Sequence, residues 1–154
     1  MPSVRFCLLA HLIPTAAALC TAQHAGTIDV VSALFGSESS RQAFSRQESA
    51  HTEVAALFPT RKRELTYGEF DLANFLALLD SVDPKPGEIF LDVGSGCGRL
   101  VLAASLAYPI LGCSYGIELL PELHASALAA HGRLTTFLRD EPTIGIAPCE
   151  LVCD

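Results

Sequence analysis

The chain has 154 residues, of which 50% are hydrophobic and 18% are charged, and its formal net charge is −7. This length accommodates one domain with a buried core but not two of ordinary size, and the composition excludes a disordered acidic tail. Basic residues are few after Glu64, so this part of the chain has no positive surface able to hold nucleic acid by neutralising phosphates.

The first 22 residues have the organisation of a targeting peptide. Arg5 is followed by an apolar run too short to span a membrane as a helix, and small residues suited to cleavage lie near Cys20 and Ala22. We therefore predict a signal or targeting peptide over residues 1–22, with no transmembrane segment after its removal. Such a leader favours the secretory pathway, a plastid or another organelle.

Residues 23–63 are predicted to form a linker or transit segment that is largely disordered. From Gly36 to Arg63 the chain is rich in Ser, Arg, Gln and Ala and has few apolar positions in a regular pattern. Three explanations remain open: a two-part organelle leader, a disordered tail ahead of an enzyme, and an incorrect gene start. The basic cluster Arg61–Arg63 is interpreted as a solvated domain edge.

The remainder, residues 64–154, is predicted to be the N-terminal part of a folded domain. A helix is expected over Asp71–Val82, where apolar residues recur at helical spacing, and the prolines and glycine of Asp83–Gly87 should end it. A strand over Ile89–Val93 is then followed by a glycine-rich loop and by a helix over Arg99–Ala107. This order is typical of an α/β fold.

The strand–helix pattern then repeats. A second strand is predicted over Gly112–Glu118 and a second, alanine-rich helix over Pro121–Ala130, while Cys149–Cys153 is a candidate third strand. The alternation predicts a doubly wound, mostly parallel sheet with helices on both faces. Because such sheets have about five or more strands, we expect this chain to hold only the front half of the domain.

The glycine-rich loop Asp92–Gly98 lies at the carboxyl end of the first strand, where doubly wound sheets open a ligand crevice. Its glycines follow the spacing GxGxG and not the GxGxxG of dinucleotide sites. Asp92 repels phosphate but attracts the ammonium and sulfonium groups of S-adenosyl-L-methionine. Glu118, at the end of the second strand, is expected to accept hydrogen bonds from both ribose hydroxyls. A dinucleotide-dependent dehydrogenase is disfavoured, and a tight turn without a ligand is the structural alternative.

The six cysteines are scattered and make a poor disulfide framework. Cys149 and Cys153 form a CxxxC with no nearby His, which we interpret as thiols near a strand and not as a zinc site. No metal site is predicted.

Three motifs, Thr66–Glu69, Phe90–Leu100 and Tyr115–Glu118, resemble the disruptor-of-telomeric-silencing family of non-SET histone-lysine methyltransferases. The resemblance covers about Leu65 to Ala127, and the Tyr-Gly-Glu element is its most specific part. It implies a Rossmann-like fold of the class I S-adenosylmethionine-dependent methyltransferases, S-adenosyl-L-methionine as cofactor, a histone in a nucleosome as methyl acceptor, and the nucleus as location.

The loop and the resemblance together define a predicted cofactor set. In the family, Tyr-Gly-Glu closes over the methionine part of the cofactor, which by resemblance brings the first three residues into the pocket. The set is Tyr67, Gly68, Glu69, Phe90, Asp92, Gly94, Ser95, Gly96, Gly98, Arg99 and Glu118. Two residues depart from the family pattern: Phe70 stands where a Thr usually follows the Glu, and Arg99 where a Gln often follows the last glycine.

The sequence thus predicts an S-adenosylmethionine-dependent methyltransferase, by resemblance one that acts on a lysine of a core histone. The alternatives are a small-molecule or organelle methyltransferase and a noncatalytic adenosyl-binding fragment. Methyl transfer needs alignment, desolvation and a deprotonated acceptor amine, not a protein nucleophile, so no catalytic residue is assigned. A chain that stops before the acceptor channel is expected to bind cofactor weakly and to turn over little.

Overall fold

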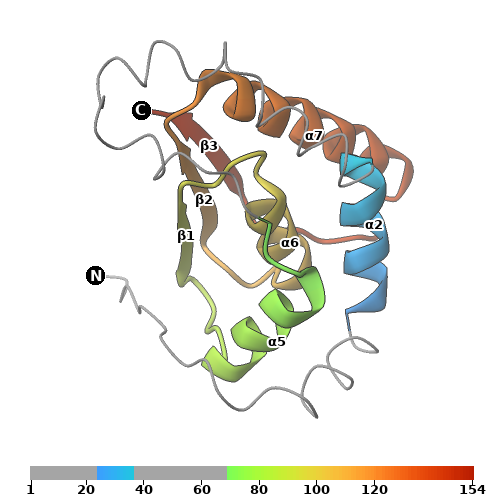
Figure 1. Cartoon of the computed structure of the whole chain (residues 1–154). Helices are drawn as coiled ribbons and strands as arrows, with labels where there is room; N and C mark the ends of the chain where they lie inside the picture. The colour runs from blue at the N-terminus through green and yellow to red at the C-terminus, as the bar shows by residue number, and fades with distance from the viewer. Residues whose placement is uncertain (1–23, 37–68) are drawn as a thin grey trace.

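The structure is a computed structural model that describes residues 24–36 and 69–154 (Figure 1). Within these ranges the strands are β1 (Ile89–Val93), β2 (Cys113–Glu118) and β3 (Cys149–Cys153). The helices are α2 (Ala25–Phe35), α5 (Leu72–Val82), α6 (Arg99–Ala107) and α7 (Pro121–Asp140). The predicted targeting peptide over residues 1–22 lies outside the described residues.

The three strands form a parallel sheet in the order β1-β2-β3, with Ile89 opposite Cys113 and Ser114 opposite Cys149. Each parallel step is made by a crossover helix, α6 between β1 and β2 and α7 between β2 and β3 (Figure 1). The predicted α/β fold with parallel strands is confirmed, and so is the strand over Cys149–Cys153. The carboxyl ends of all three strands therefore lie at one edge of the sheet.

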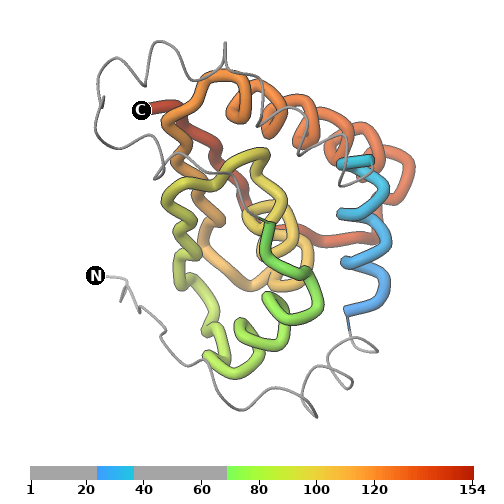
Figure 2. The backbone as a smooth tube through the Cα atoms, in the orientation of Figure 1, coloured from blue at the N-terminus to red at the C-terminus, as the bar shows by residue number. Residues whose placement is uncertain are grey.

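The described helices pack on one face of the sheet (Figures 1 and 2). They share one core, whose fully buried members include Val31, Leu76, Leu102 and Leu134. The prediction of helices on both faces is not met in the described ranges, because both crossovers step in the same direction along the sheet and right-handed crossovers of one direction put their helices on one side. That the sheet is incomplete stays a prediction.

The opposite face of the sheet carries several exposed apolar side chains. They are Ile89, Leu91, Val93 and Val152, which are 38% to 74% exposed. We call this set the open face; the helix-bearing side is the covered face.

Helix α2 lies inside the segment predicted to be a linker. Ile28, Val31 and Phe35 recur at helical spacing, and α2 packs against α6 and α7. The Arg133 side chain on α7 donates from Nε to the carbonyl oxygen of Leu34 at 2.8 Å. The linker prediction is therefore wrong over these residues, because the Ser- and Arg-rich composition begins only after α2. The rest of the predicted linker, beyond Gly36, lies outside the described residues.

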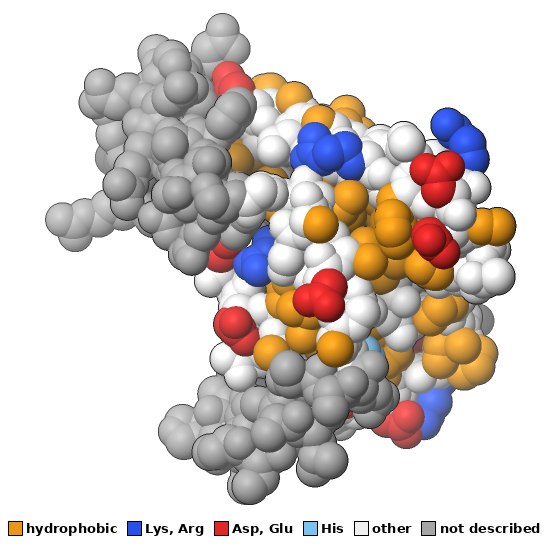
Figure 3. Space-filling view, turned by 90° about the vertical axis from the view of Figure 1, so that its right-hand side faces the viewer, with side chains coloured by type: hydrophobic (Ala, Val, Ile, Leu, Met, Phe, Trp, Pro, Cys, Tyr) orange, Lys and Arg blue, Asp and Glu red, His pale blue; other side chains and the backbone are white. Residues whose placement is uncertain are grey.

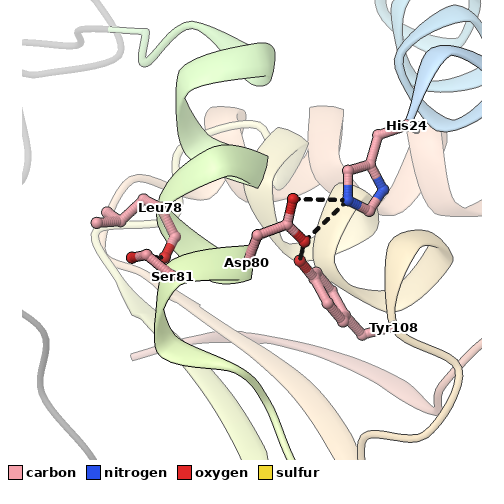
Figure 4. A network of polar contacts seen from close by, with 5 residues as sticks. All are labelled: His24, Leu78, Asp80, Ser81 and Tyr108. Atoms are coloured by element: carbon pink, nitrogen blue, oxygen red, sulfur yellow. Dashed lines mark hydrogen bonds and ion pairs between the residues drawn. The ribbon is translucent and has the colours of Figure 1, made fainter. Parts of the chain in front are cut away.

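A polar network joins the start of α2 to α5 and to the end of α6 (Figure 4). The Asp80 carboxylate accepts a hydrogen bond from the Tyr108 hydroxyl and lies 3.1 Å from Nε2 of His24. The His24 and Tyr108 rings are 5.7 Å apart, and His24 is buried. The network thus provides partners for polar groups that the packing of three helices removes from water.

The helix predicted over Pro121–Ala130 extends to Asp140. Thr135 and Thr136 each donate their hydroxyl to the carbonyl four residues earlier, and Leu134 is fully buried. Core packing therefore outweighs the weak helix propensity of threonine in this half of the helix.

The surface has a mixed character on the side that Figure 3 presents. Lys and Arg side chains lie apart from one another there, among hydrophobic and acidic groups. In the part of the chain that the structure describes, no helix is both long and apolar enough to cross a membrane. Within residues 24–36 and 69–154, no cluster of three His, Cys, Asp or Glu side chains is arranged to hold a metal ion.

Candidate functional site

A pocket opens at the carboxyl end of β1, where the glycine loop runs into α6. Its described lining residues come from the loop, from the first turn of α6 and from the segment before α5. They are Glu69, Phe70, Asp92, Gly94, Ser95, Gly96, Arg99 and Leu100. All except Phe70 and Leu100 belong to the predicted cofactor set, and each of these two adjoins a member of it. Tyr67 and Gly68 lie outside the described residues.

The loop turns sharply through glycines in the left-handed backbone region. Gly94 has a φ of 80° and Gly98 a φ of 77°, values that strain any residue with a Cβ. A Cβ at Gly94 would meet no atom within 4 Å, so the space before it is open. A Cβ at Gly98 would lie 3.0 Å from the Cβ of Ala127. Gly98 therefore permits the close approach of α7 and does not line the pocket.

The backbone N–H groups of the loop are already occupied. Those of Gly94 and Ser95 both donate to the Ile117 carbonyl oxygen, at 2.8 and 3.0 Å. The N–H of Gly96 donates to Oε2 of Glu118 at 2.6 Å. A phosphate-binding loop instead leaves such groups free to surround the anion. These three N–H groups are not available to a phosphate.

Glu118 is buried beneath the loop and ties it to the end of β2. Its Oε2 bonds to Gly96, and its Oε1 accepts a hydrogen bond from the Leu120 N–H at 2.8 Å. The carboxylate therefore orders the loop. Each of its oxygens can accept a further hydrogen bond, so its predicted contact with ribose hydroxyls stays a prediction.

Asp92 lies on the covered face of β1 at the end next to the pocket. Burial raises the pKa of its carboxyl group, and the nearby Glu118 carboxylate raises this pKa further. Among the described residues, nothing forms a hydrogen bond or ion pair with the Asp92 carboxylate. A cation in the pocket would offset both the loss of water and the repulsion by Glu118.

Arg99 and Glu69 form an ion pair at the pocket. Nη1 of Arg99 lies 3.2 Å from Oε2 of Glu69 and also donates to the carbonyl oxygen of Phe70 at 3.2 Å. The two side chains are only 17% and 8% exposed. The pair connects the end of the predicted Tyr-Gly-Glu element to the first turn of α6.

Besides Gly98, the positions of Phe90 and Gly116 differ from the prediction. Phe90 lies outside the pocket, because α5 covers that part of β1 and Phe75 packs edge-on against the Phe90 ring, with centroids 5.6 Å apart. Gly116 was not assigned to the site, yet a Cβ there would come within 2.9 Å of both Ser95 Oγ and Val101 Cγ2. A glycine inside an apolar strand is the signal for such a close approach.

The fold and the pocket together define an α/β protein with a glycine-loop crevice at the carboxyl edge of a parallel sheet. Residues 60–140, more than half of the chain, match the family described as histone methylation protein DOT1. The chain belongs to this family. The resemblance found in the sequence is confirmed.

The chain is also similar to a histone-lysine N-methyltransferase, H3 lysine-79 specific, from Eremothecium gossypii. The two are 48% identical over 66 residues, which cover 41% of this chain and 10% of that protein. The matched part of this chain therefore represents about a tenth of the length of its curated relative.

Proposed function

We propose that this chain binds S-adenosyl-L-methionine and serves a histone-lysine N-methyltransferase of the non-SET type. Membership of the DOT1 family and the similarity to an H3 lysine-79 specific enzyme support the reaction and its acceptor. The environment of Asp92 is the observation that carries the cofactor assignment. Its carboxyl group is partly buried and lies near the buried Glu118. The N–H groups of Gly94, Ser95 and Gly96 in the adjoining loop already donate hydrogen bonds to protein oxygens.

The electrostatics of the pocket favour a cation over a pyrophosphate. S-adenosylmethionine has a sulfonium, an ammonium and one carboxylate, so its amino-acid end has a net positive charge that Asp92 attracts. A nicotinamide dinucleotide would bring phosphates toward Asp92 and would find the N–H groups of Gly94, Ser95 and Gly96 occupied. The dehydrogenase alternative is therefore disfavoured.

The proposed contacts divide by chemistry. Asp92 binds the cationic end of the ligand, and Glu118 binds the ribose. Glu69 contacts the methionine part, together with Tyr67 and Gly68, which precede it. When bound, S-adenosylmethionine supplies a methyl group already activated on its sulfonium. The side chains of this chain therefore orient the ligand and exclude water, and no protein nucleophile is required.

The same family relationship supports three finer proposals. They are a class I, Rossmann-like methyltransferase domain, a nucleosomal histone as partner, and a nuclear location. The predicted targeting peptide over residues 1–22 points to the secretory pathway or an organelle, and it stays a prediction.

Isothermal titration with S-adenosylmethionine and with NAD tests the cofactor. We expect the wild-type chain to bind S-adenosylmethionine and not NAD, and Asp92→Asn to weaken binding about tenfold or more, because it removes a charge-assisted contact. Asp140→Asn, at the exposed end of α7, is the matched control and should leave affinity unchanged. Unchanged affinity in both Asp92→Asn and Glu118→Gln would refute the cofactor assignment.

Methyl transfer from labelled S-adenosylmethionine to nucleosomes, free histones and small amines tests the acceptor. Labelling of a histone lysine supports the proposed reaction. Labelling of small amines alone would favour a small-molecule methyltransferase. Cofactor binding without transfer to any acceptor would favour a noncatalytic adenosyl-binding module.

A further inference from the structure

Strand β1 lies at one margin of the sheet, and its exposed side chains are all apolar. It pairs with β2, and no described strand pairs with its other side (Figure 1). We call Ile89, Leu91 and Val93 the outer row; they are 38%, 42% and 74% exposed. An open strand edge that carries apolar side chains is a template for the addition of another strand.

The outer row also supplies the unpaired backbone groups of β1. In a parallel pair, alternate residues of a strand direct their backbone groups toward the neighbouring strand. Just before β1, the carbonyl oxygen of Glu88 accepts a hydrogen bond from the N–H of Gly112. Just after it, the N–H of Gly94 donates to the carbonyl oxygen of Ile117. Even-numbered residues therefore face β2, and the N–H and C=O groups of the outer row point away from it.

The free edge of β3 is protected by a charge, whereas that of β1 is not. Glu150 on β3 lies on the same side of the sheet as Val152 and is exposed. Charged side chains on an edge strand hinder the addition of another strand. Asp92, the charged residue of β1, points instead to the covered face. Of the two edges of the described sheet, that of β1 is therefore the one suited to strand pairing.

The outer row is complementary to a second copy of itself. Antiparallel pairing about a two-fold axis at Leu91 sets the two Leu91 side chains side by side and places Ile89 of each copy beside Val93 of the other. Opposite residues whose backbone groups face each other exchange both hydrogen bonds in such a ladder. All of these cross-strand pairs are apolar. Two molecules of net charge −7 thus meet in the outer row without a like-charge contact.

Stacking of two open faces would cover the same residues less favourably. The Glu150 carboxylate lies beside Tyr115 on that side of the sheet. Stacking would bury this carboxylate against an equally acidic copy, which is costly without a compensating cation. Pairing at the edge of β1 instead leaves Glu150 in water, together with the outer surfaces of the outer row.

We propose that two copies of this chain associate through antiparallel pairing of their β1 strands, which joins the two sheets into one. The inference goes beyond the proposed function and does not depend on the cofactor. Sedimentation velocity of the whole chain at about 100 μM tests it. We expect a species of twice the 16.4 kDa of one chain, which dissociates on dilution because a single strand pair is a small interface.

Two variants of opposite charge test the register. The variant with Ile89→Lys and Val93→Lys should be monomeric, because like charges then lie opposite each other across the axis. The variant with Ile89→Glu and Val93→Glu should be monomeric for the same reason. An equimolar mixture of the two should form a mixed dimer, since opposite charges meet at both pairs. Val152→Lys, on the open face but on β3, is the matched control and should keep the dissociation constant within about threefold of the wild type.

Leu91→Pro tests the backbone contribution, because it removes an outward N–H that the ladder between β1 and β2 does not use. It should raise the dissociation constant of the dimer at least about tenfold. Thermal unfolding verifies that each variant is folded, and Leu91→Thr, a milder change, serves if Leu91→Pro is not.

Three results would overturn the inference. The first is a wild-type chain that sediments as a monomer at this concentration. The second is dissociation by Val152→Lys as complete as that by the charged β1 variants, which would indicate stacked open faces. The third is the absence of a mixed dimer when both charged variants are folded, which would place the contact away from the outer row.

Discussion

The two faces of the sheet carry different side chains and have different surroundings. The covered face carries Phe90, Asp92, Gly116 and Leu151 against the helices, whereas the open face carries Ile89, Leu91, Val93 and Val152. Side-chain alternation separates the two sets. Continuous apolar strands are typical of sheets buried on both faces. Hydrophobicity along a strand therefore does not report whether helices in the described residues cover a given face.

The largest difference between the faces should appear when a leucine is truncated on each side. Leu102, fully buried on α6, supports the covered face, and Leu91 on β1 is 42% exposed. We expect Leu102→Ala to lower the free energy of unfolding by about 2–5 kcal/mol, through lost burial and a cavity. Leu91→Ala should lower it by less than about 1 kcal/mol. Denaturant titration measures both, and equal losses would mean that Leu91 is covered in solution.

A smaller loss of stability is expected when a methyl group is added at a tightly packed glycine of the covered face. Gly116→Ala should destabilise the chain by about 1–3 kcal/mol, because the new methyl would come within 2.9 Å of Ser95 Oγ and Val101 Cγ2. Gly132→Ala is the matched control. It lies in α7 with nothing within 4 Å of its added Cβ, and should stabilise the chain by about 0.5–1 kcal/mol. Thermal unfolding distinguishes the two signs, and a neutral Gly116→Ala would contradict the close packing.

The smallest effect concerns pH and Asp92. Because burial and Glu118 raise the pKa of this carboxyl in the folded chain, the folded state holds the proton more tightly than the unfolded state. The stability that Asp92 contributes is therefore present below its ordinary pKa and is lost as pH rises through the raised pKa. Without ligand, Asp92→Asn should melt above the wild type at about pH 7.5 and close to it at about pH 4. The opposite sign at neutral pH would show that a protein cation already compensates Asp92.

The elements with strong local signals could be predicted from the sequence. β1 and α6 begin and end where predicted, because prolines and glycines delimit them. α2 and the second half of α7 were not predicted, since their stability depends on contacts with distant residues. His24 meets Asp80, and Arg133 meets the carbonyl of Leu34, across long stretches of chain.

The candidate site was predictable to the extent that parallel strands bring their carboxyl ends together. This rule places Asp92 near Glu118 and brings the glycine loop between them. It does not tell which donors the protein itself occupies. The bond from Gly96 to Glu118 and the ion pair of Arg99 with Glu69 depend on loop and helix packing that no short pattern encodes.

Helix α2 bears on how a recombinant fragment of this chain should be cut. The family match begins at residue 60, downstream of α2. A fragment begun there would lack Val31 and Leu34, which belong to the same buried cluster as Leu76 and Leu134. Water would then reach the sides of α6 and α7 on which α2 packs, and solubility would suffer. The unit that folds is therefore larger than the unit that homology detects, and a fragment for ligand-binding work should begin ahead of His24.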